Sequence, residues 1–229
     1  KPSKEQIINQ AFKFHSQGNI PEAAKLYQYF INQGFKDHRV FSNYGAILKD
    51  QGKLQEAELS TRKAIELKKD FADAHLNLGN ILIDLGKLKD AELSQRKAIE
   101  LNPNLAEAHY NLGIILVDIG KLQEAEVSQR KAIELNPDYA EAHSNLGIIL
   151  LQKDEHQLAL QSFSKSAELL RGEQIQGTDK IKSTKTSKAK IVHDIEQFEY
   201  LASQGYESEN FRALASLYTQ VAAEINWPS

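Results

Sequence analysis

One pattern of apolar and polar positions recurs along the chain every 34 residues. Taken over all repeats, apolar or small residues predominate at positions 3, 4, 7, 8, 10, 11 and 14, which fall on one side of a helix. A turn follows at position 15, where Gly18, Gly52, Gly86 and Gly120 stand, and a second helical pattern starts near position 18. The pattern predicts a hairpin of two helices in every repeat.

The repeats begin at Lys4, His38, Ala72, Ala106 and Ala140 and follow one another without a gap. Residues 72–105 and 106–139 are identical at 24 of 34 positions. Position 8 is small in every repeat and position 20 is alanine in every repeat. Repetition at this period is typical of a solenoid, in which each repeat packs mainly against its neighbours.

These features resemble the tetratricopeptide repeat (TPR) family. The resemblance implies an all-α fold: a right-handed α-solenoid of five helix hairpins, with additional C-terminal helices. We assign the five repeats to residues 4–37, 38–71, 72–105, 106–139 and 140–173.

The composition changes after the repeats. Residues 174–190 are rich in Lys, Ser and Thr, which predicts a flexible linker. No aromatic residue alternates with these lysines and the net charge is -3, so we expect no binding to nucleic acid. Residues 191–227 regain a helical pattern and are expected to form a hairpin, which either caps the solenoid or begins a further domain.

Two polar rows lie on the side of the first helices that faces away from the core, which lines the concave groove in the TPR family. They resemble the asparagine and aspartate ladders with which the O-linked N-acetylglucosamine transferase holds peptides by their backbone. An asparagine offers donors and an acceptor and can therefore bind a peptide of any sequence. Alternatively, these asparagines bond a neighbouring helix. The predicted peptide-binding residues are Asn9, Asn43, Asn77, Asn111 and Asn145 at position 6, and Asp50, Asp84 and Asp118 at position 13.

An apolar strip is predicted on the same side of the first helices. A contiguous apolar patch on an exposed helix face usually marks a contact. Its occupant could be a partner's segment, a second copy of the chain, or the helices after residue 190. The strip comprises Leu76, Ile83, Tyr110, Ile114, Val117, Ile148 and Leu151.

Other chemistry is not apparent in the chain. His75, His109 and His143 recur 34 residues apart, which is too far for the ligands of one ion, so we expect a ring nitrogen of each to be hydrogen-bonded within the fold. We predict no metal, no cofactor and no catalytic site in these residues. The carboxylate clamp by which some members of the TPR family bind acidic tails needs basic groove residues. Position 2 offers only Arg39, so we do not expect this mode of binding.

Composition adds little to this picture. The chain contains no cysteine, which fits a reducing compartment such as the cytoplasm. Its apolar runs are short, so we expect no membrane span.

We therefore expect a module that binds a peptide or protein segment in its concave groove. One alternative is the substrate-recruiting part of a larger enzyme whose catalytic domain follows Ser229. Residues 191–227 weakly resemble the junction of bacterial TPR proteins that carry a 2-oxoglutarate and iron oxygenase-like domain, and sulfotransferase and glycosyltransferase domains also follow such repeats. The other alternative is a self-assembling scaffold, that is, a homo-oligomer.

Overall fold

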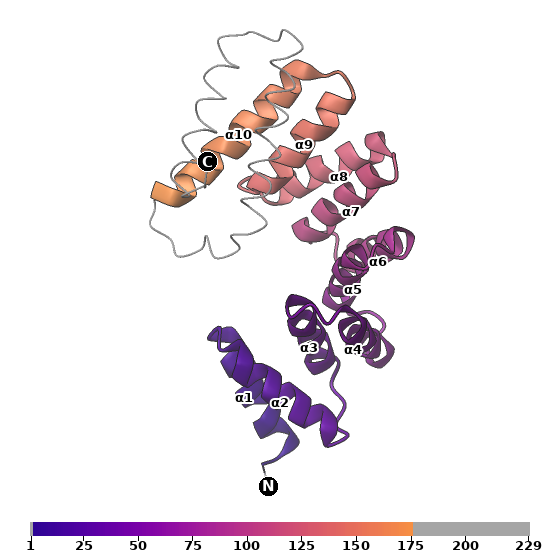
Figure 1. Ribbon diagram of the computed structural model, residues 1–229, viewed down its shortest axis with the longest axis vertical. Coiled ribbons are helices and arrows are strands. Elements are labelled where there is room, and N and C mark those ends of the chain that lie inside the picture. The colour runs from indigo at the N-terminus through magenta and orange to yellow at the C-terminus, as the bar shows by residue number, and fades with distance from the viewer. Residues whose placement is uncertain (1, 176–229) are drawn as a thin grey trace. The chain divides into compact units, whose positions relative to one another are not determined.

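The computed structural model describes residues 2–175 and contains only α-helices and turns in that range (Figure 1). The fold is all-α, as predicted. In chain order the helices are α1 (Lys4–Ser16), α2 (Ile20–Asn32), α3 (His38–Asp50), α4 (Leu54–Leu67), α5 (Ala72–Asp84), α6 (Leu88–Leu101), α7 (Ala106–Asp118), α8 (Leu122–Leu135), α9 (Ala140–Gln152) and α10 (His156–Ile175).

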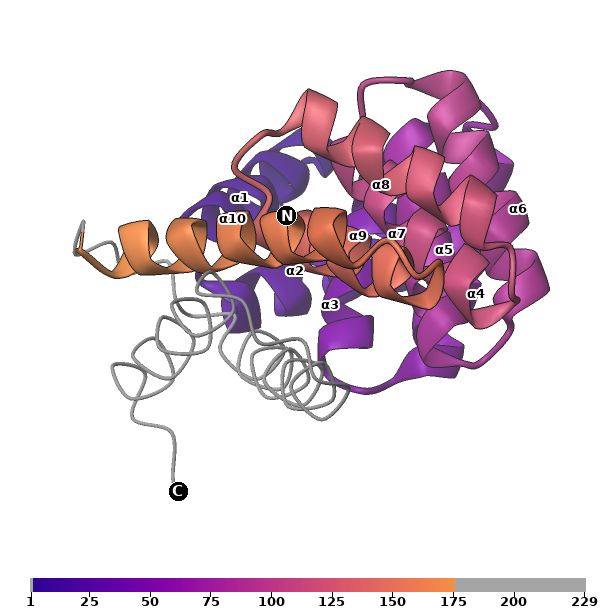
Figure 2. The same cartoon turned by 90° about the horizontal axis from the view of Figure 1, so that it is seen from above.

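The helices pair as antiparallel neighbours along the chain. Helices α1 and α2, α3 and α4, α5 and α6, and α9 and α10 pack against each other, and the two perpendicular views show the hairpin of α3 and α4 (Figure 1, Figure 2). Each odd-numbered helix begins at the first residue of a 34-residue repeat. The chain separates within α7 into two compact parts, residues 1–115 and 116–229, which are described individually below.

Small side chains let the two helices of a hairpin approach each other. The alanine at position 20 is fully buried in all five repeats, at Ala23, Ala57, Ala91, Ala125 and Ala159. Opposite the second helix, the glycine at position 8 leaves no room for a side chain. A Cβ added to Gly45 would collide with Thr61, and one added to Gly79 would collide with Gln95. Position 8 therefore needs a small residue, because the side chain on the opposite helix fills the remaining space.

The side chain that covers position 8 comes from position 24 and differs between repeats. It is aromatic in the first and last repeats, as Tyr27 and Phe163, both fully buried. Thr61 and Gln95 stand there in the second and third repeats, also fully buried. The Thr61 hydroxyl and the Gln95 carbonyl oxygen have no hydrogen-bond partner among the described residues. A buried polar atom without a partner costs about 1–3 kcal/mol, so these two hairpins carry a penalty that the first avoids.

The turn between the two helices requires a left-handed backbone. Gly52 and Gly86 have φ of 75° and 69°, a region that glycine enters without strain. In the last repeat Asp154 occupies the equivalent position with φ of 60°. Aspartate is one of the few other residues that tolerate this region, so the turn keeps its geometry without glycine.

The end of α10 differs from the expected domain boundary. The sequence predicts a linker over residues 174–190, whereas α10 continues to Ile175. Arg171 stands where the third and fourth repeats have a proline. Because adding residues to an existing helix costs little compared with starting one, the helix overruns the repeat by two residues. The remaining linker and the predicted hairpin at 191–227 lie outside the described residues. None of the described helices is long and apolar enough to cross a membrane.

Replacing Gly147 by alanine should test the close approach of the two helices. The new Cβ would lie 2.7 Å from Cε1 of Phe163, a rigid ring that is fully buried. In an open helix position, Gly→Ala stabilises by up to about 1 kcal/mol. Here the overpacking should prevail and lower the free energy of unfolding by about 1–3 kcal/mol, measured by thermal and urea denaturation. A raised melting temperature for Gly147→Ala would contradict this packing.

Candidate functional site

The position-6 asparagines of the N-terminal part tie each repeat to the one before it. Asn43 donates from Nδ2 to the Tyr27 hydroxyl at 3.3 Å. Asn77 donates from Nδ2 to the Ser42 hydroxyl at 3.0 Å. Asn111 donates from Nδ2 to Oδ1 of Asn80 at 2.7 Å. In all three residues the amide nitrogen is therefore engaged with the preceding repeat, as the alternative interpretation of the sequence anticipated.

These bonds fix which end of each amide remains for a ligand. Because Nδ2 faces the preceding repeat, the opposite atom of the same planar group, Oδ1, is the one that can accept from outside. The three bonds above use one N–H of each amide and leave Oδ1 of Asn43, Asn77 and Asn111 unengaged. The binding of a peptide carbonyl and amide by each asparagine stays a prediction. Asn9 is exposed on α1, and Asn145 is half-buried on α9 in the C-terminal part.

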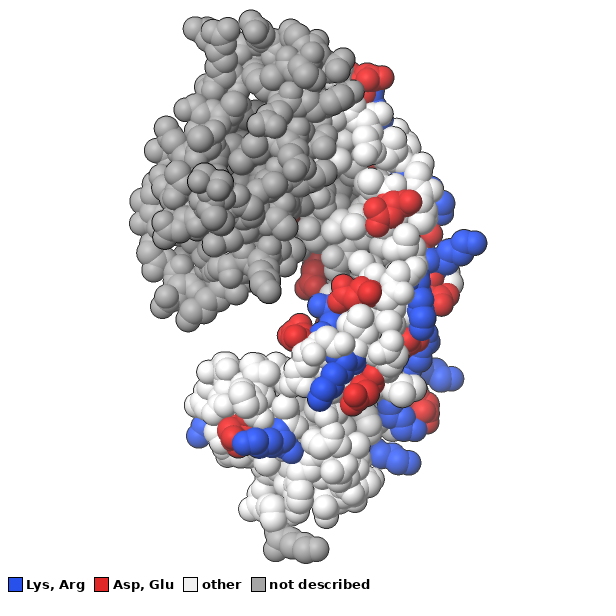
Figure 3. Space-filling model, viewed as in Figure 1, with Lys and Arg blue, Asp and Glu red and all other residues white. Residues whose placement is uncertain are grey.

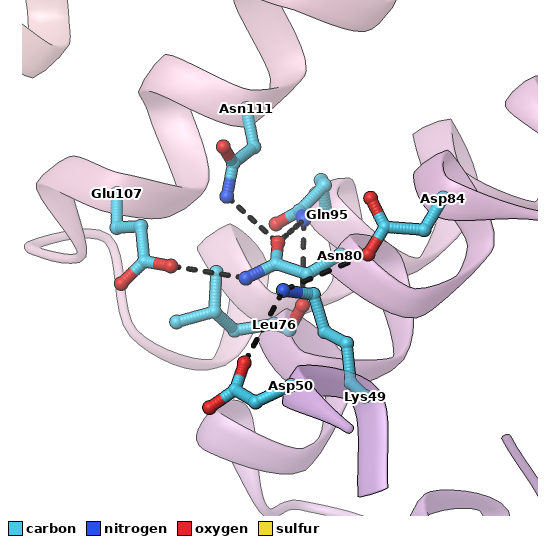
Figure 4. A network of polar contacts seen from close by, with 8 residues as sticks. All are labelled: Lys49, Asp50, Leu76, Asn80, Asp84, Gln95, Glu107 and Asn111. Carbon is cyan, nitrogen blue, oxygen red and sulfur yellow. Dashed lines mark hydrogen bonds and ion pairs between the residues drawn. The ribbon is translucent and has the colours of Figure 1, made fainter. Parts of the chain in front are cut away.

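Asn80 is the centre of a polar network that sequence reasoning missed (Figure 4). Its Oδ1 accepts from Nδ2 of Asn111 and from Nε2 of Gln95, at 2.7 and 2.8 Å. Its Nδ2 donates to Oε1 of Glu107 at 3.0 Å. The network joins α5, α6 and the start of α7 and holds the Asn111 amide in one orientation. Asn80 occupies position 9, where the other repeats have no asparagine, so periodicity gave no signal for it.

The predicted aspartates of the N-terminal part lie on either side of a lysine (Figure 4). The Lys49 ammonium is 3.8 Å from Oδ1 of Asp50 and 3.6 Å from Oδ2 of Asp84. The aspartate side chains are 75% and 43% exposed. We call the surface formed by Asn43, Asn77, Asn111, Asp50 and Asp84, together with Lys49, the ladder face. Asp118, the third predicted aspartate, is exposed near the end of α7 in the C-terminal part.

The apolar strip is less open than the sequence suggested. Leu76 is only 8% exposed and packs in the core with Ala98 and Ala108, so assigning it to an exposed strip was wrong. A helical wheel treats one helix alone, whereas position 5 of α5 also meets the next repeat. The other six members, Ile83, Tyr110, Ile114, Val117, Ile148 and Leu151, are half-buried, and their role in binding stays a prediction.

The recurring histidines are hydrogen-bonded, as predicted. Nε2 of His75, His109 and His143 lies 2.9–3.0 Å from the backbone carbonyl six residues earlier, at Lys69, Pro103 and Pro137. Each ring therefore donates from Nε2 to the loop that precedes its helix. No group of three or more potential metal ligands gathers in the part of the chain that the structure describes.

The outer face carries exposed apolar residues that sequence reasoning also missed. Leu59 and Leu93 occupy position 22 and are 72% and 67% exposed. Leu93 borders a surface groove of about 440 Å³ that is also lined by Ile65 and Leu78. The basic residues nearby are paired within their helices, and Figure 3 shows basic and acidic side chains side by side along one edge of the face that it draws. The apolar residue that recurs at position 22 could have predicted these exposed side chains from the sequence.

Comparison with known proteins bears on the fold. Residues 45–86, 79–120 and 115–154 each match the family model described as TPR repeat. Among solved structures, the chain is similar to MamA of Desulfovibrio magneticus RS-1, at 24% identity and a TM-score of 0.64 over 74% of this chain and 96% of that one. No curated protein matches the chain.

Two further structures share the architecture. YrrB, described as a TPR protein with an unusual peptide-binding site, is 24% identical with a TM-score of 0.61 over 73% of this chain and 86% of YrrB. A thermophilic TPR protein of Thermus thermophilus is 18% identical with a TM-score of 0.59 over 73% and 91% of the two chains. At these identities the likeness establishes the fold.

Glu58 joins two repeats on the outer face. Its carboxylate accepts from Lys87 at 2.7 Å and from Arg62 at 2.8 Å and is only 14% exposed. The hydrogen bond from Lys87 and then that from Arg62 hold the pKa of Glu58 below its usual value, against the opposing effect of burial. Because the folded pKa lies below the unfolded one, the resulting stability is present above the unfolded pKa and is lost as pH falls through the folded pKa.

Glu58→Gln should therefore destabilise the protein in a pH-dependent way. Near pH 7 the variant should unfold with a free energy lower by about 1 kcal/mol, since the charge attraction to Lys87 and Arg62 is lost. The gap between wild type and variant should close as pH falls through the lowered folded pKa of Glu58, where the wild-type carboxylate becomes protonated. Melting temperatures measured across this range would check it, with Glu100→Gln, whose side chain is 67% exposed beside Lys97, as the control. A gap that persists unchanged into strong acid would exclude this role for Glu58.

Proposed function

The chain belongs to the tetratricopeptide repeat family, and from this we propose that its ladder face binds an extended segment of another protein, mainly through the segment's backbone. The proposal assigns binding, and no catalysis, to the described residues. It rests on one observation above all: in three successive repeats the position-6 amide nitrogen bonds to the preceding repeat, although the partner differs each time. Nδ2 of Asn43, Asn77 and Asn111 bonds to the preceding repeat in each case.

Repetition turns a weak contact into a useful one. A single net hydrogen bond contributes about 0.5–1.5 kcal/mol, too little for a specific complex. Several hydrogen bonds to the same segment add up, because most of the entropy cost of fixing the segment's position and orientation arises only once. The inter-repeat bonds hold the amides before a ligand arrives, so fewer side-chain rotamers need to be ordered on binding. A backbone-directed row also tolerates many sequences, since every residue except proline offers an N–H.

The asparagines of the ladder face are buried or half-buried, so a bound segment would contact them along only one of its edges. Asn111 is 9% exposed and Asn43 and Asn77 are half-buried, so a ligand would meet the amide tips. Half-buried Ile83, Tyr110 and Ile114 lie on the same helices and would provide apolar surface beside the polar row. YrrB, which has the same fold, is described as having a peptide-binding site. That description supports a peptide ligand here without locating the site.

The Asn77 side chain offers a clean test because its two roles can be separated. Asn77→Ala removes both the inter-repeat bond to Ser42 and the carbonyl that would accept from a ligand. Ser42→Ala removes the same inter-repeat bond but keeps the Asn77 carbonyl, and Ser42 itself is 1% exposed and cannot contact a ligand. The two variants should therefore lose similar stability and differ in binding.

Random peptides displayed on phage and enriched on the full chain supply the probes, and fluorescence anisotropy measures their affinities. We expect Asn77→Ala to weaken binding about fivefold, equivalent to roughly 1 kcal/mol. Ser42→Ala should weaken it by clearly less. Circular dichroism should show both variants fully helical. Equal affinities for wild type and Asn77→Ala would remove the asparagine row from the binding site.

A further inference from the structure

Resting on the function proposed above, we infer that the ladder face selects an extended segment of another protein that carries lysine or arginine side chains. Two independent observations lead to this class of ligand. The first concerns hydrogen-bond acceptors, and the second concerns charge.

The ladder face presents more hydrogen-bond acceptors than donors. Asn43, Asn77 and Asn111 each give one N–H of Nδ2 to the preceding repeat, and these bonds engage none of their carbonyl oxygens. Both ends of the Asn80 amide are also occupied. The unengaged carbonyl oxygens and the carboxylates of this surface favour a ligand that brings donors, because an acceptor placed against them would leave both groups unsatisfied.

Charge on the same side of the first helices points the same way. Asp50, Asp84, Asp73 and Glu107 are all exposed carboxylates at positions 13 or 2. The Lys49 ammonium lies between two of them, Asp50 and Asp84. Arg39, the remaining cation at these positions, is held by Asp37 through hydrogen bonds of 3.1 and 2.9 Å. The surface therefore favours a cationic ligand and disfavours an acidic one.

Lys49 marks where a cationic side chain would lie. Its ammonium stands between Asp50 and Asp84 at 3.8 and 3.6 Å, beyond the length of a good charge-assisted hydrogen bond. Such loose pairs contribute little, so neither aspartate is strongly committed to Lys49. A lysine or arginine from the ligand could pair with the outer oxygens of these aspartates. Lys49 would then repel it, which makes removal of Lys49 a gain-of-binding test.

The spacing of the repeats suits an extended ligand with a basic residue at every third position. An extended chain advances about 10 Å over three residues. Packed helices lie about 8–10 Å apart, and the first helices α3 and α5 are in direct contact. One basic residue would therefore recur with each repeat, beside a backbone N–H directed at the asparagine row.

The test uses the full chain and two synthetic Ser/Ala-rich peptides, with lysine at every third position in one and glutamine in the other. The readout is the ratio of their affinities, measured by fluorescence anisotropy at low and high salt. Wild type should prefer the lysine peptide, and the preference should shrink in high salt as the exposed charges are screened. Lys49→Met should raise the ratio about two- to fivefold, and Asp50→Asn with Asp84→Asn should lower it by a similar factor.

Matched variants on the outer face control for net charge. Lys63→Met removes an ammonium with a side chain 35% exposed, against 30% for Lys49. Glu66→Gln and Glu100→Gln together remove two exposed carboxylates. These variants change the total charge as the ladder variants do, so the ratio should stay near its wild-type value. A change as large as that of the ladder variants would show that net charge, rather than this face, sets the preference.

The outcomes separate this inference from the function on which it rests. One outcome is that the variants of Lys49, Asp50 and Asp84 leave the affinity ratio unchanged while Asn77→Ala still weakens the binding of both peptides. In that case the inferred preference for basic segments is wrong and the proposed binding through the backbone stands. If Asn77→Ala also has no effect, the proposed function fails as well. If glutamine substitution of Lys180, Lys182, Lys185, Lys188 and Lys190 raises the affinity for the lysine peptide, the chain's own lysines are the occupant, and a partner's segment is not.

Discussion

The two helices of a hairpin approach so closely that the first helix carries only glycine or alanine where the second crosses it. Gly45, Gly79 and Gly147 meet Thr61, Gln95 and Phe163 at this point, and in each case an added Cβ would overlap the opposite side chain. The contact fixes the rotation of the first helix about its axis. Once that rotation is set, positions 6 and 13 must face away from the hairpin core. The ladder face is thus a consequence of how the hairpin packs.

The position-6 asparagines act at the boundary between neighbouring repeats. In a repeat protein, stability depends on the interface between each repeat and the next. Asn77 and Asn111 contribute to that interface through Nδ2 and present Oδ1 on the other side of the same planar group. A ligand that accepts this orientation binds a surface that is already ordered. Binding and cohesion between repeats are consequently linked, because a ligand that binds only the stacked form also stabilises it.

The elements that recur could be predicted from the sequence, and those that depend on a neighbouring repeat could not. The period placed the starts of the odd-numbered helices, and recurrence singled out the asparagines of position 6 and the bonded histidines. Leu76 was misassigned because its burial comes from Ala98 and Ala108 on two other helices. Asn80 and Lys49 each occur once at their position, so no repetition marked them. Their partners became visible only when helices from different repeats were set side by side.

The residue at position 24 has a further consequence for how the array comes apart. Repeat arrays usually lose structure from their ends, where a repeat has one neighbour instead of two. In this chain the first repeat is closed by Tyr27 and the last by Phe163, whereas the second and third bury Thr61 and Gln95 with unmet polar atoms. The second and third hairpins thus have poorer interiors than the first and the fifth. This favours transient opening of these two repeats, which carry most of the ladder face.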